Sequence, residues 1–533
     1  MLRGLLAGRY FATVLVSSLL LCTQGSWPVV AAEHLEVEFD GVVLPVKVSD
    51  LSQWVRTGGA TRSELNSWFM LLNEDSRAGL IRLLKAPVLT RRSLGQQMLR
   101  SWAAGPLLDA LGELIRADGA DRVRSEEVLS TFERLLQDQK SISTLDLLQA
   151  LPSERLRLDL DSLVLAATRW RRQMERHQKL TTSLSRTPAT PMQDVEEELS
   201  SPSFSPKRMR LPVPHRREGL PVEIWTPVRR SMKGPSSWIL LMPGLGGDPD
   251  HFQWLARSLV AEGWPVAVLA HPGSDSAAVQ ALLKGQQPFV GADALRQRLA
   301  DLNTVLIAQH SGELPVAGDQ VVLIGHSLGA LTALLAVGVS PVAGISERCR
   351  AALEDLPLTN LSILLQCELA ASGALQTVTT PSMVKAVVGL NSFGSLIWPS
   401  SIAGTVRQPM LLLGGTLDLI TPPISEQLAL LTSLGHHPTS RAVIVEGASH
   451  FSPIRVEGQT GEEQGDDLFQ LGEELVGVQP LTVQRLLIRE LVGFLKEVDN
   501  DEPMGGSKHL RSDSVRWHRL NRGDAARLVN KNQ

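Results

Sequence analysis

The sequence predicts an α/β protein with a mainly parallel, doubly wound sheet, preceded by a mostly helical N-terminal domain. Three observations support this prediction. From about residue 208 to residue 500, short apolar runs typical of buried strands alternate with helical segments. Between residues 51 and 180, apolar residues recur three and four positions apart, as on one face of a helix. The third is the pentapeptide Gly325-His326-Ser327-Leu328-Gly329, which lies between a strand-like and a helix-like segment.

Length and composition indicate a globular chain of two or three domains. The chain has 533 residues, more than one ordinary hydrophobic core contains. Apolar residues make up 43% and charged residues 20%, and the formal net charge is −4. This balance gives no sign of a strongly charged partner, so we expect no binding to nucleic acid.

Residues 1–32 have the pattern of an export signal. Arg3 and Arg9 precede an apolar run of about a dozen residues, and Val30-Ala31-Ala32 offers small residues for cleavage. The run is shorter than the roughly 20 residues that a membrane-spanning helix needs. We therefore expect the protein to be periplasmic or secreted. An uncleaved N-terminal membrane anchor is the alternative.

Cysteine usage agrees with export. Cys22 belongs to the signal, which leaves Cys349 and Cys367, 18 residues apart. In an oxidising compartment this pair predicts a disulfide. Closing a loop of that size would stabilise the fold by roughly 3 kcal/mol. Two buried thiols are the alternative.

The N-terminal domain, residues 33–180, begins with a short β-like piece over 35–39 and 42–46 and then becomes helical. Amphipathic patterns predict helices over 63–69, 77–84, 106–117, 125–137, 144–151 and 160–177. The domain has no glycine-rich phosphate loop and no metal-ligand spacing, so we expect a packing or regulatory module. Residues 181–207, rich in Ser, Thr, Pro and Glu, predict a linker.

The second domain, residues 208–500, opens with a predicted hairpin over 208–214 and 220–227. Further strands are expected over 238–242, 265–269, 319–324, 384–390, 410–413 and 442–445. Helices are expected over 251–262, 295–309, 330–336 and 483–498.

Three segments depart from this alternation. Residues 339–383, which contain the cysteine pair, follow the helix after the pentapeptide and are predicted as a lid. Residues 457–474 carry seven acidic residues and are interpreted as a solvated loop or as a rim beside the site. Residues 501–533 predict a disordered basic tail, which offers peripheral contact with a membrane.

Ser327 is the predicted nucleophile. The apolar run 319–324 precedes the pentapeptide and the small-residue helix 330–336 follows it. Strand, sharp turn and helix are the context in which G-x-S-x-G forms a nucleophile elbow and lifts the serine hydroxyl above the sheet edge. A side chain at either glycine would collide with the neighbouring strand and helix. The alternative is a glycine-rich helix start that binds a phosphate through its N–H groups.

A serine hydroxyl needs a base to accept its proton and an acid to orient that base. Asp418 follows the strand over 410–413, and His450 follows the last predicted strand, which gives the order Ser, Asp, His. Asp418 could instead form an Asx turn or a helix cap, and a lone histidine is more often structural. His436 and His437 precede the last strand and lie at the wrong end of it.

Acyl transfer also needs two backbone donors aimed at the carbonyl oxygen. We expect them to be the N–H of Leu328 and, from the glycine-rich stretch 243–247, the N–H of Leu245. His326 is expected to pack beneath the elbow, and His271 to belong to a structural loop. No metal or cofactor is expected.

The stretches Pro243-Gly244-Leu245-Gly246-Gly247, His271-Pro272-Gly273-Ser274-Asp275 and Gly325-His326-Ser327-Leu328-Gly329 resemble the predicted dienelactone hydrolases of bacteria. That group is related to the platelet-activating factor acetylhydrolases. The resemblance covers about 208–500 and implies the α/β-hydrolase fold, with Asp418 and His450 at the positions of the acid and the base. Residues 33–180 resemble the helical domain of the "alpha/beta hydrolase of unknown function" type found in front of such hydrolases.

Two departures from the family bear on the substrate. Family members often have His-Gly where this chain has Pro243-Gly244. True dienelactone hydrolases use a cysteine nucleophile, whereas this chain has Ser327, which favours an ordinary ester. We therefore expect a serine hydrolase that cleaves carboxylic esters, with lipid acyl and acetyl esters among the candidates, and no protein partner. A peptidase, an acyltransferase and a non-catalytic binding protein on a hydrolase scaffold are the alternatives.

Overall fold

The computed structural model divides into two compact units, Met1–Arg91 with Leu108–Leu163 and Arg92–Leu107 with Val164–Gln533. It describes residues 32–59, 64–70, 74–85, 87–90, 108, 115–117, 125–192, 205–227, 237–283, 286, 290–354, 359–375, 381–399, 406–454, 480–512 and 515–532. The predicted export signal, but for residue 32, and the predicted acidic segment 457–474 lie outside these residues. Among the described residues, no helix has the length and apolar character needed to cross a membrane.

The N-terminal unit combines a small sheet with short helices. Its four-stranded sheet has the order β2-β1-β6-β4, formed by β1 (His34–Phe39), β2 (Val42–Lys47), β4 (Ile115–Ala117) and β6 (Arg155–Asp159). A second pairing joins β3 (Pro87–Thr90) to β5 (Ser141–Ser143). The helices are α2 (Val48–Arg56), α3 (Glu64–Phe69), α4 (Glu74–Lys85), α7 (Ser125–Asp138) and α8 (Thr144–Ala150).

Most of the elements predicted for this unit are confirmed, with one error. The strands expected over 35–39 and 42–46 form the β1–β2 hairpin. The helix expected over 106–117 is wrong at its end, because residues 115–117 form β4 and pair antiparallel with β6. Ile115 is buried, so the sheet contact overrides the helical spacing of its neighbours.

Helix α9 (Leu160–Ser185) crosses the boundary between the two units. It is longer than the predicted 160–177, and its last residues occupy the start of the predicted linker 181–207. Leu180 and Leu184 are buried in the core of the second unit. This burial explains why the polar composition of the segment did not end the helix.

The second unit is built on an 11-stranded sheet with the order β7-β16-β17-β15-β14-β13-β12-β10-β11-β9-β8. The first three strands of this order are β7 (Thr190–Pro191), β16 (Lys508–Arg511) and β17 (Arg516–Leu520). Six central strands are parallel: β10 (Ser237–Met242), β11 (Val266–Leu269), β12 (Gln320–His326), β13 (Val384–Leu390), β14 (Met410–Gly415) and β15 (Arg441–Val445). The antiparallel hairpin of β8 (Lys207–Val213) and β9 (Arg216–Trp225) forms one edge. The predicted hairpin and the mainly parallel sheet are confirmed.

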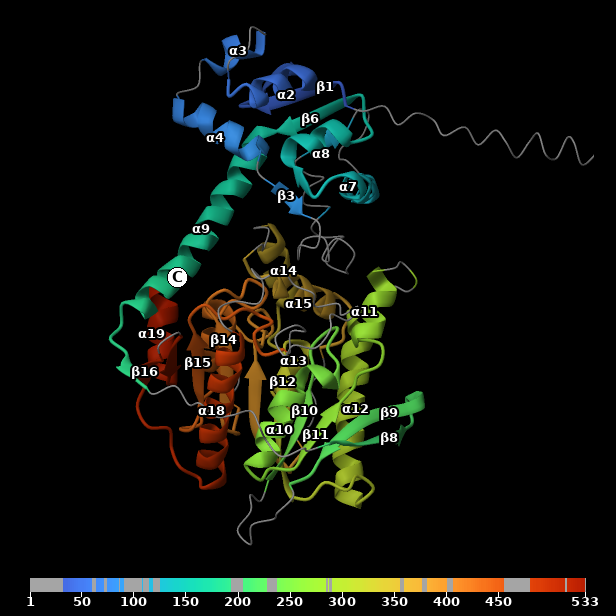
Figure 1. Ribbon diagram of the computed structural model, residues 1–533, viewed down its shortest axis with the longest axis vertical. Coiled ribbons are helices and arrows are strands. Elements are labelled where there is room, and N and C mark those ends of the chain that lie inside the picture. The colour runs from blue at the N-terminus through green and yellow to red at the C-terminus, as the bar shows by residue number, and fades with distance from the viewer. Residues whose placement is uncertain are drawn as a thin grey trace, which may run out of the picture. The chain divides into compact units, whose positions relative to one another are not determined.

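Helices cover both faces of this sheet, as Figure 1 shows. Successive residues of β10 alternate between two cores, with Trp238 and Leu240 in one and Ile239 and Leu241 in the other. The first core is covered by α12 (Gly291–Ser311), α13 (Leu328–Ala336), α16 (Ala429–Leu434) and α19 (Arg522–Asn532). The second is covered by α10 (Gln253–Ala261) and α18 (Pro480–Asp499).

The predicted lid, residues 339–383, contains two helices, α14 (Ile345–Glu354) and α15 (Ser362–Ala371). Cys349 on α14 and Cys367 on α15 form a disulfide with their Cα atoms 5.4 Å apart, which confirms the predicted pairing. The backbone N–H of Ser362 donates to the carbonyl of Ile420 at 2.8 Å. The start of α15 is thereby fixed against the loop that carries Asp418.

The prediction of a disordered tail over 501–533 is wrong for its described part. Residues Lys508–Arg511 form β16 and Arg516–Leu520 form β17, and β17 pairs antiparallel with β15. Trp517 is buried, and Arg519 makes hydrogen bonds of 2.9 and 3.0 Å to the buried carboxylate of Glu490. Two of the basic residues that suggested a solvated tail therefore make ion pairs within the fold, Arg519 with Glu490 and Arg516 with Glu446.

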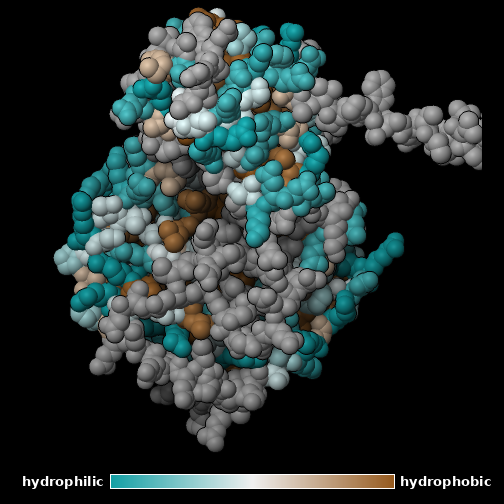
Figure 2. Space-filling view, turned by 45° about the horizontal axis from the view of Figure 1, so that its top comes forward, coloured by the Kyte–Doolittle hydropathy of each residue, from teal (hydrophilic) through white to brown (hydrophobic). Residues whose placement is uncertain are grey.

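The described surface is mostly polar in the view of Figure 2, where apolar side chains form small separate groups. Among the described residues, the large apolar side chains that are exposed are Val42, Val43, Met70, Leu165, Val290, Ile307, Leu353, Leu417 and Leu419. Two of them, Leu417 and Leu419, flank Asp418.

Candidate active site

Ser327 occupies a strained turn between β12 and α13. Its backbone has φ 52° and ψ −115°, a conformation that a residue with a side chain rarely adopts. The Ser327 N–H donates to the carbonyl of Leu390 at 2.9 Å, and its own carbonyl accepts from the N–H of Leu331 at 3.0 Å. These hydrogen bonds to β13 and α13 keep the Ser327 backbone in this strained conformation. Such strain costs on the order of 1–3 kcal/mol and is characteristic of functional sites.

The two glycines of the pentapeptide are required by close backbone contacts. A Cβ at Gly325 would lie 2.2 Å from the carbonyl of Gly329, and a Cβ at Gly329 would lie 2.1 Å from the carbonyl oxygen of Met242. Real Cβ atoms do not approach other atoms so closely. The collisions expected from the sequence, with the helix at one glycine and the neighbouring strand at the other, are therefore confirmed.

Asp418 and His450 meet on loops that follow β14 and β15. The His450 Nδ1 lies 3.0 Å from the Asp418 Oδ2, and both side chains are buried. A donated Nδ1–H would fix the ring and leave Nε2 as the proton acceptor. The loop that carries His450 also contacts the turn of Ser327, because the His326 Nε2–H donates to the carbonyl of His450 at 3.0 Å.

The carboxylate of Asp418 is enclosed by donors. Its Oδ1 accepts the N–H groups of Ile420 at 2.9 Å and Thr421 at 2.7 Å, and its Oδ2 accepts the Thr421 hydroxyl at 2.6 Å. Burial acts to raise the pKa of Asp418, but His450 and these hydrogen bonds outweigh it and lower the pKa to about 2. The Asx turn considered as an alternative is thus formed by the same carboxylate that contacts His450.

Asn391 is a partner of this acid that the sequence did not indicate. It follows β13 directly and adopts φ 50°, a left-handed conformation that asparagine tolerates better than most residues. Its Nδ2 donates to the Asp418 Oδ2 at 2.7 Å, the same oxygen that faces His450. A polar residue at the carboxyl end of a central strand was the available signal, but no motif separated it from other loop residues.

The loop after β10 lies beside the nucleophile. A Cβ at Gly244 would be 3.1 Å from the Ser327 Cβ. The N–H groups of Gly246 and Gly247 already donate to the carbonyls of Ser274 at 2.9 Å and Gly244 at 3.2 Å. Since proline has no N–H, the donors of the loop 243–247 that make no such bond to another described residue are the N–H groups of Gly244 and Leu245.

Leu328 supplies the other expected donor. It is the first residue of α13, so no carbonyl of its own helix can accept its N–H. The positive end of the helix dipole adds to the favourable field for an anion at this point. Both backbone donors expected from the sequence therefore belong to segments that border Ser327.

His326 and His271, which the sequence placed near the site in structural roles, are both buried in the fold. His326 is buried, with its ring centroid 5.0 Å from that of His450, and burial together with His450 lowers the pKa of His326 to about 3. His271 is buried as well, and its Nδ1 lies 2.9 Å from the Asp301 Oδ2. Burial lowers the pKa of His271 to about 4. Both are neutral at pH 7, and both occupy the structural roles expected for them.

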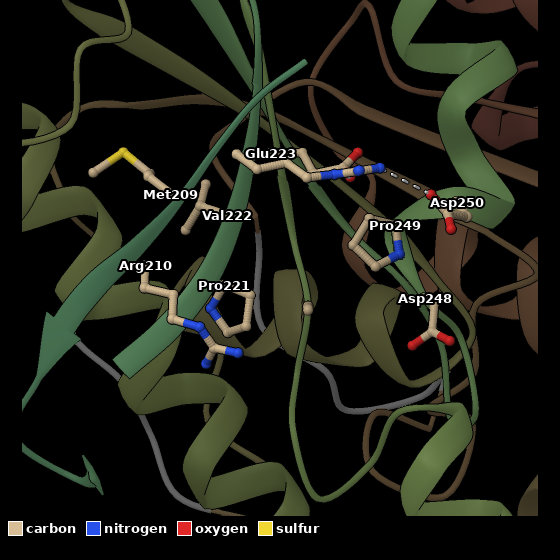
Figure 3. A pocket seen from close by; sticks show the side chains of 10 residues that line it. Met209, Arg210, Pro221, Val222, Glu223, Asp248, Pro249 and Asp250 are labelled. Atoms are coloured by element: carbon tan, nitrogen blue, oxygen red, sulfur yellow. Dashed lines mark hydrogen bonds and ion pairs between the residues drawn. The ribbon is translucent and has the colours of Figure 1, made fainter. Parts of the chain in front are cut away.

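A separate open pocket of about 590 Å³ lies beside the β8–β9 hairpin (Figure 3). Its charged groups are largely paired with one another, since Arg208 lies 2.7 Å from Glu223 and 3.7 Å from Asp250. None of the predicted site residues lines it. Within the described part of the chain, no cluster of three or more His, Cys, Asp or Glu side chains is arranged to hold a metal ion.

Residues 31–159 match the family model described as "Alpha/beta hydrolase of unknown function (DUF1400)". The match lies in the N-terminal part of the chain and covers less than half of its length. Together with the large, mainly parallel sheet, it confirms the predicted α/β-hydrolase fold and supports placing the chain among the α/β hydrolases. No curated protein matches the chain.

Proposed function

We propose that this α/β hydrolase is an exported serine esterase that cleaves carboxylic esters through Ser327, His450 and Asp418. The observation that carries the proposal is the 3.0 Å contact between His450 Nδ1 and Asp418 Oδ2 on a loop that also rests against the strained serine elbow. A structural histidine has no need of this combination, whereas a base that activates a serine requires it.

The reaction follows from these positions. The Ser327 Oγ attacks the ester carbonyl carbon while His450 Nε2 takes its proton. The resulting oxyanion accepts hydrogen bonds from the N–H groups of Leu245 and Leu328. The C–O bond to the alcohol breaks, and His450 returns the proton to the departing oxygen. Water then repeats the sequence on the acyl-enzyme and releases the acid. Throughout, Asp418 orients the imidazole and stabilises its protonated form.

Esters of apolar acids or alcohols are the proposed substrates. Leu417 and Leu419, on either side of the acid, are 50% and 36% exposed, which supports an apolar approach to the site. Lipid acyl and acetyl esters belong to this class.

The test is steady-state hydrolysis of a panel of acetyl, butyryl and longer acyl esters by the wild type and Ser327→Ala. We expect hydrolysis with an initial burst of alcohol in the wild type, and a loss of at least about 10⁴-fold in the variant. Equal rates for the two proteins would overturn the proposal. Acyl transfer to an added alcohol at the expense of hydrolysis would instead identify an acyltransferase, and cleavage confined to amides a peptidase.

Export is proposed on separate grounds, namely the pattern of residues 1–32 and the disulfide between Cys349 and Cys367. N-terminal sequencing of the mature protein from the extracytoplasmic fraction tests it. We expect the mature chain to begin at Glu33. Retention of the full-length chain in the cytoplasm would contradict export without bearing on the esterase activity.

A further inference from the structure

The buried guanidinium of Arg298, on α12, lies directly behind the loop that borders the nucleophile. It is fully buried. Its Nη1 donates to the carbonyl of Pro243 at 2.6 Å and its Nη2 to the carbonyl of Gly244 at 2.8 Å. Its Nε donates to the Ser274 hydroxyl at 2.8 Å. One side chain thus fixes both the 243–247 loop and the 271–275 loop.

The charge of Arg298 is directed at carbonyl oxygens. Among the described residues, no carboxylate lies within ion-pair distance of it. The nearby Asp301 already accepts from Arg216 at 2.6 and 2.7 Å, from His215 at 2.6 Å and from His271 at 2.9 Å. Burial lowers the pKa of Arg298 to about 9, opposed by Asp301, so the side chain is cationic at neutral pH. Burying a cation whose hydrogen-bond partners are all neutral groups costs free energy of folding. The presence of such a cation directly behind the loop 243–247 therefore points to a use for its charge.

The carbonyl of Gly244 and the N–H of Leu245 belong to the same peptide group. A cation that hydrogen-bonds the oxygen draws electron density from the amide and makes its N–H a stronger donor, as in other hydrogen-bonded chains. The N–H of Leu245 is the donor expected to face the oxyanion.

We propose that Arg298 is a positioning residue that holds the 243–247 loop in place and polarises the Gly244–Leu245 peptide toward the oxyanion of the reacting ester. This inference rests on the proposed serine esterase function. Because this polarisation acts on the transition state and on the acyl-enzyme carbonyl, its loss should lower kcat and leave KM nearly unchanged. Complete loss of one oxyanion donor reduces kcat by about 10²–10³-fold, so loss of its polarisation should cost roughly 10–100-fold.

The test compares Arg298→Gln, which keeps a donor and loses the charge, with Arg298→Lys, which keeps the charge and loses the planar fork. Arg441→Gln is the matched control. Arg441 is also a fully buried arginine of the second unit, but it lies at the opposite end of β15 from His450 and pairs with Glu497. The measurements are kcat, KM and the infrared carbonyl stretch of an acyl-enzyme that carries a ¹³C-labelled acyl carbonyl.

We expect Arg298→Gln to shift the carbonyl band to higher frequency and to lower kcat. Arg298→Lys should have a band frequency and a kcat between those of Arg298→Gln and the wild type. Arg441→Gln should leave the band at the wild-type frequency. A fall in kcat without a band shift, or an equal shift in Arg441→Gln, would overturn the inference. If Arg298→Gln does not fold, the test rests on Arg298→Lys. A carbonyl band at the wild-type frequency together with a reduced kcat in this variant would overturn the inference. A wild type that forms no acyl-enzyme would overturn the esterase function itself, a separate outcome.

Discussion

The elbow glycines allow a sharp test of the site geometry, through the substitution Gly329→Ala. The added Cβ would lie 2.1 Å from the carbonyl oxygen of Met242 and 2.7 Å from that of Pro243. Both contacts are with backbone, at the end of β10 and the start of the loop that borders the nucleophile, so no side chain can rotate away to relieve them.

The expected cost follows from these contacts. Overpacking in a core costs about 1–3 kcal/mol where side chains can adjust. Here the backbone itself must move, so we expect Gly329→Ala to lower the free energy of unfolding by about 3 kcal/mol or more. Because the displaced segment carries the expected oxyanion donor, reaction of Ser327 with an active-site-directed phosphonate should also slow by at least about 10²-fold.

Urea unfolding and phosphonate reaction rates provide the assay, with Gly493→Ala as the control. Gly493 lies within helix α18, and a Cβ there would meet no atom within 4 Å. Because alanine has a higher helix propensity than glycine, the free energy of unfolding of this control should rise by up to about 1 kcal/mol. If Gly329→Ala had the stability and the reaction rate of the wild type, the contacts that define the elbow would be refuted.

Three further predictions concern the acid, its partner and the disulfide. Because the pKa of Asp418 is lowered to about 2, its carboxylate stabilises the fold above pH 4 by about 2 kcal/mol, and this contribution is lost as the pH falls through 2. Urea unfolding at pH 5 and pH 2.5 should show a smaller acid loss in Asp418→Asn, and parallel losses would contradict the shift. Asn391→Ala removes a donor to this carboxylate, so the pKa of Asp418 should rise and kcat fall about 10-fold; unchanged kcat would exclude a role for the amide. Replacing Cys349 and Cys367 with serine should lower stability by roughly 3 kcal/mol, and free thiols in the non-reduced wild type would contradict the disulfide.

Much of this architecture could be predicted because its signals are local. The apolar run before Ser327 and the small residues after it specify a strand and a helix, and the two glycines specify the turn between them. Asp418 and His450 follow strands in the expected order. In each case the residue type and its neighbours in sequence were sufficient.

The missed features depend on contacts between distant residues. Asn391 and Asp418 are 27 residues apart, and Arg298 lies 54 residues from Gly244. The basic charge of the tail predicts disorder, but Arg519 neutralises the buried Glu490 and Trp517 enters the core. Composition describes average exposure, and it cannot show which charges find partners in the folded chain.

The most direct measurement of the central claim is peptide mapping of the folded, full-length protein after reaction with a fluorophosphonate probe. We predict a single modified serine, Ser327, and the loss of its modification in His450→Ala, since the hydroxyl is not activated without its base. Modification of another residue would contradict the catalytic assignment of Ser327, His450 and Asp418. Labelling of Ser327 in the denatured protein and in His450→Ala at the level of the folded wild type would contradict it as well.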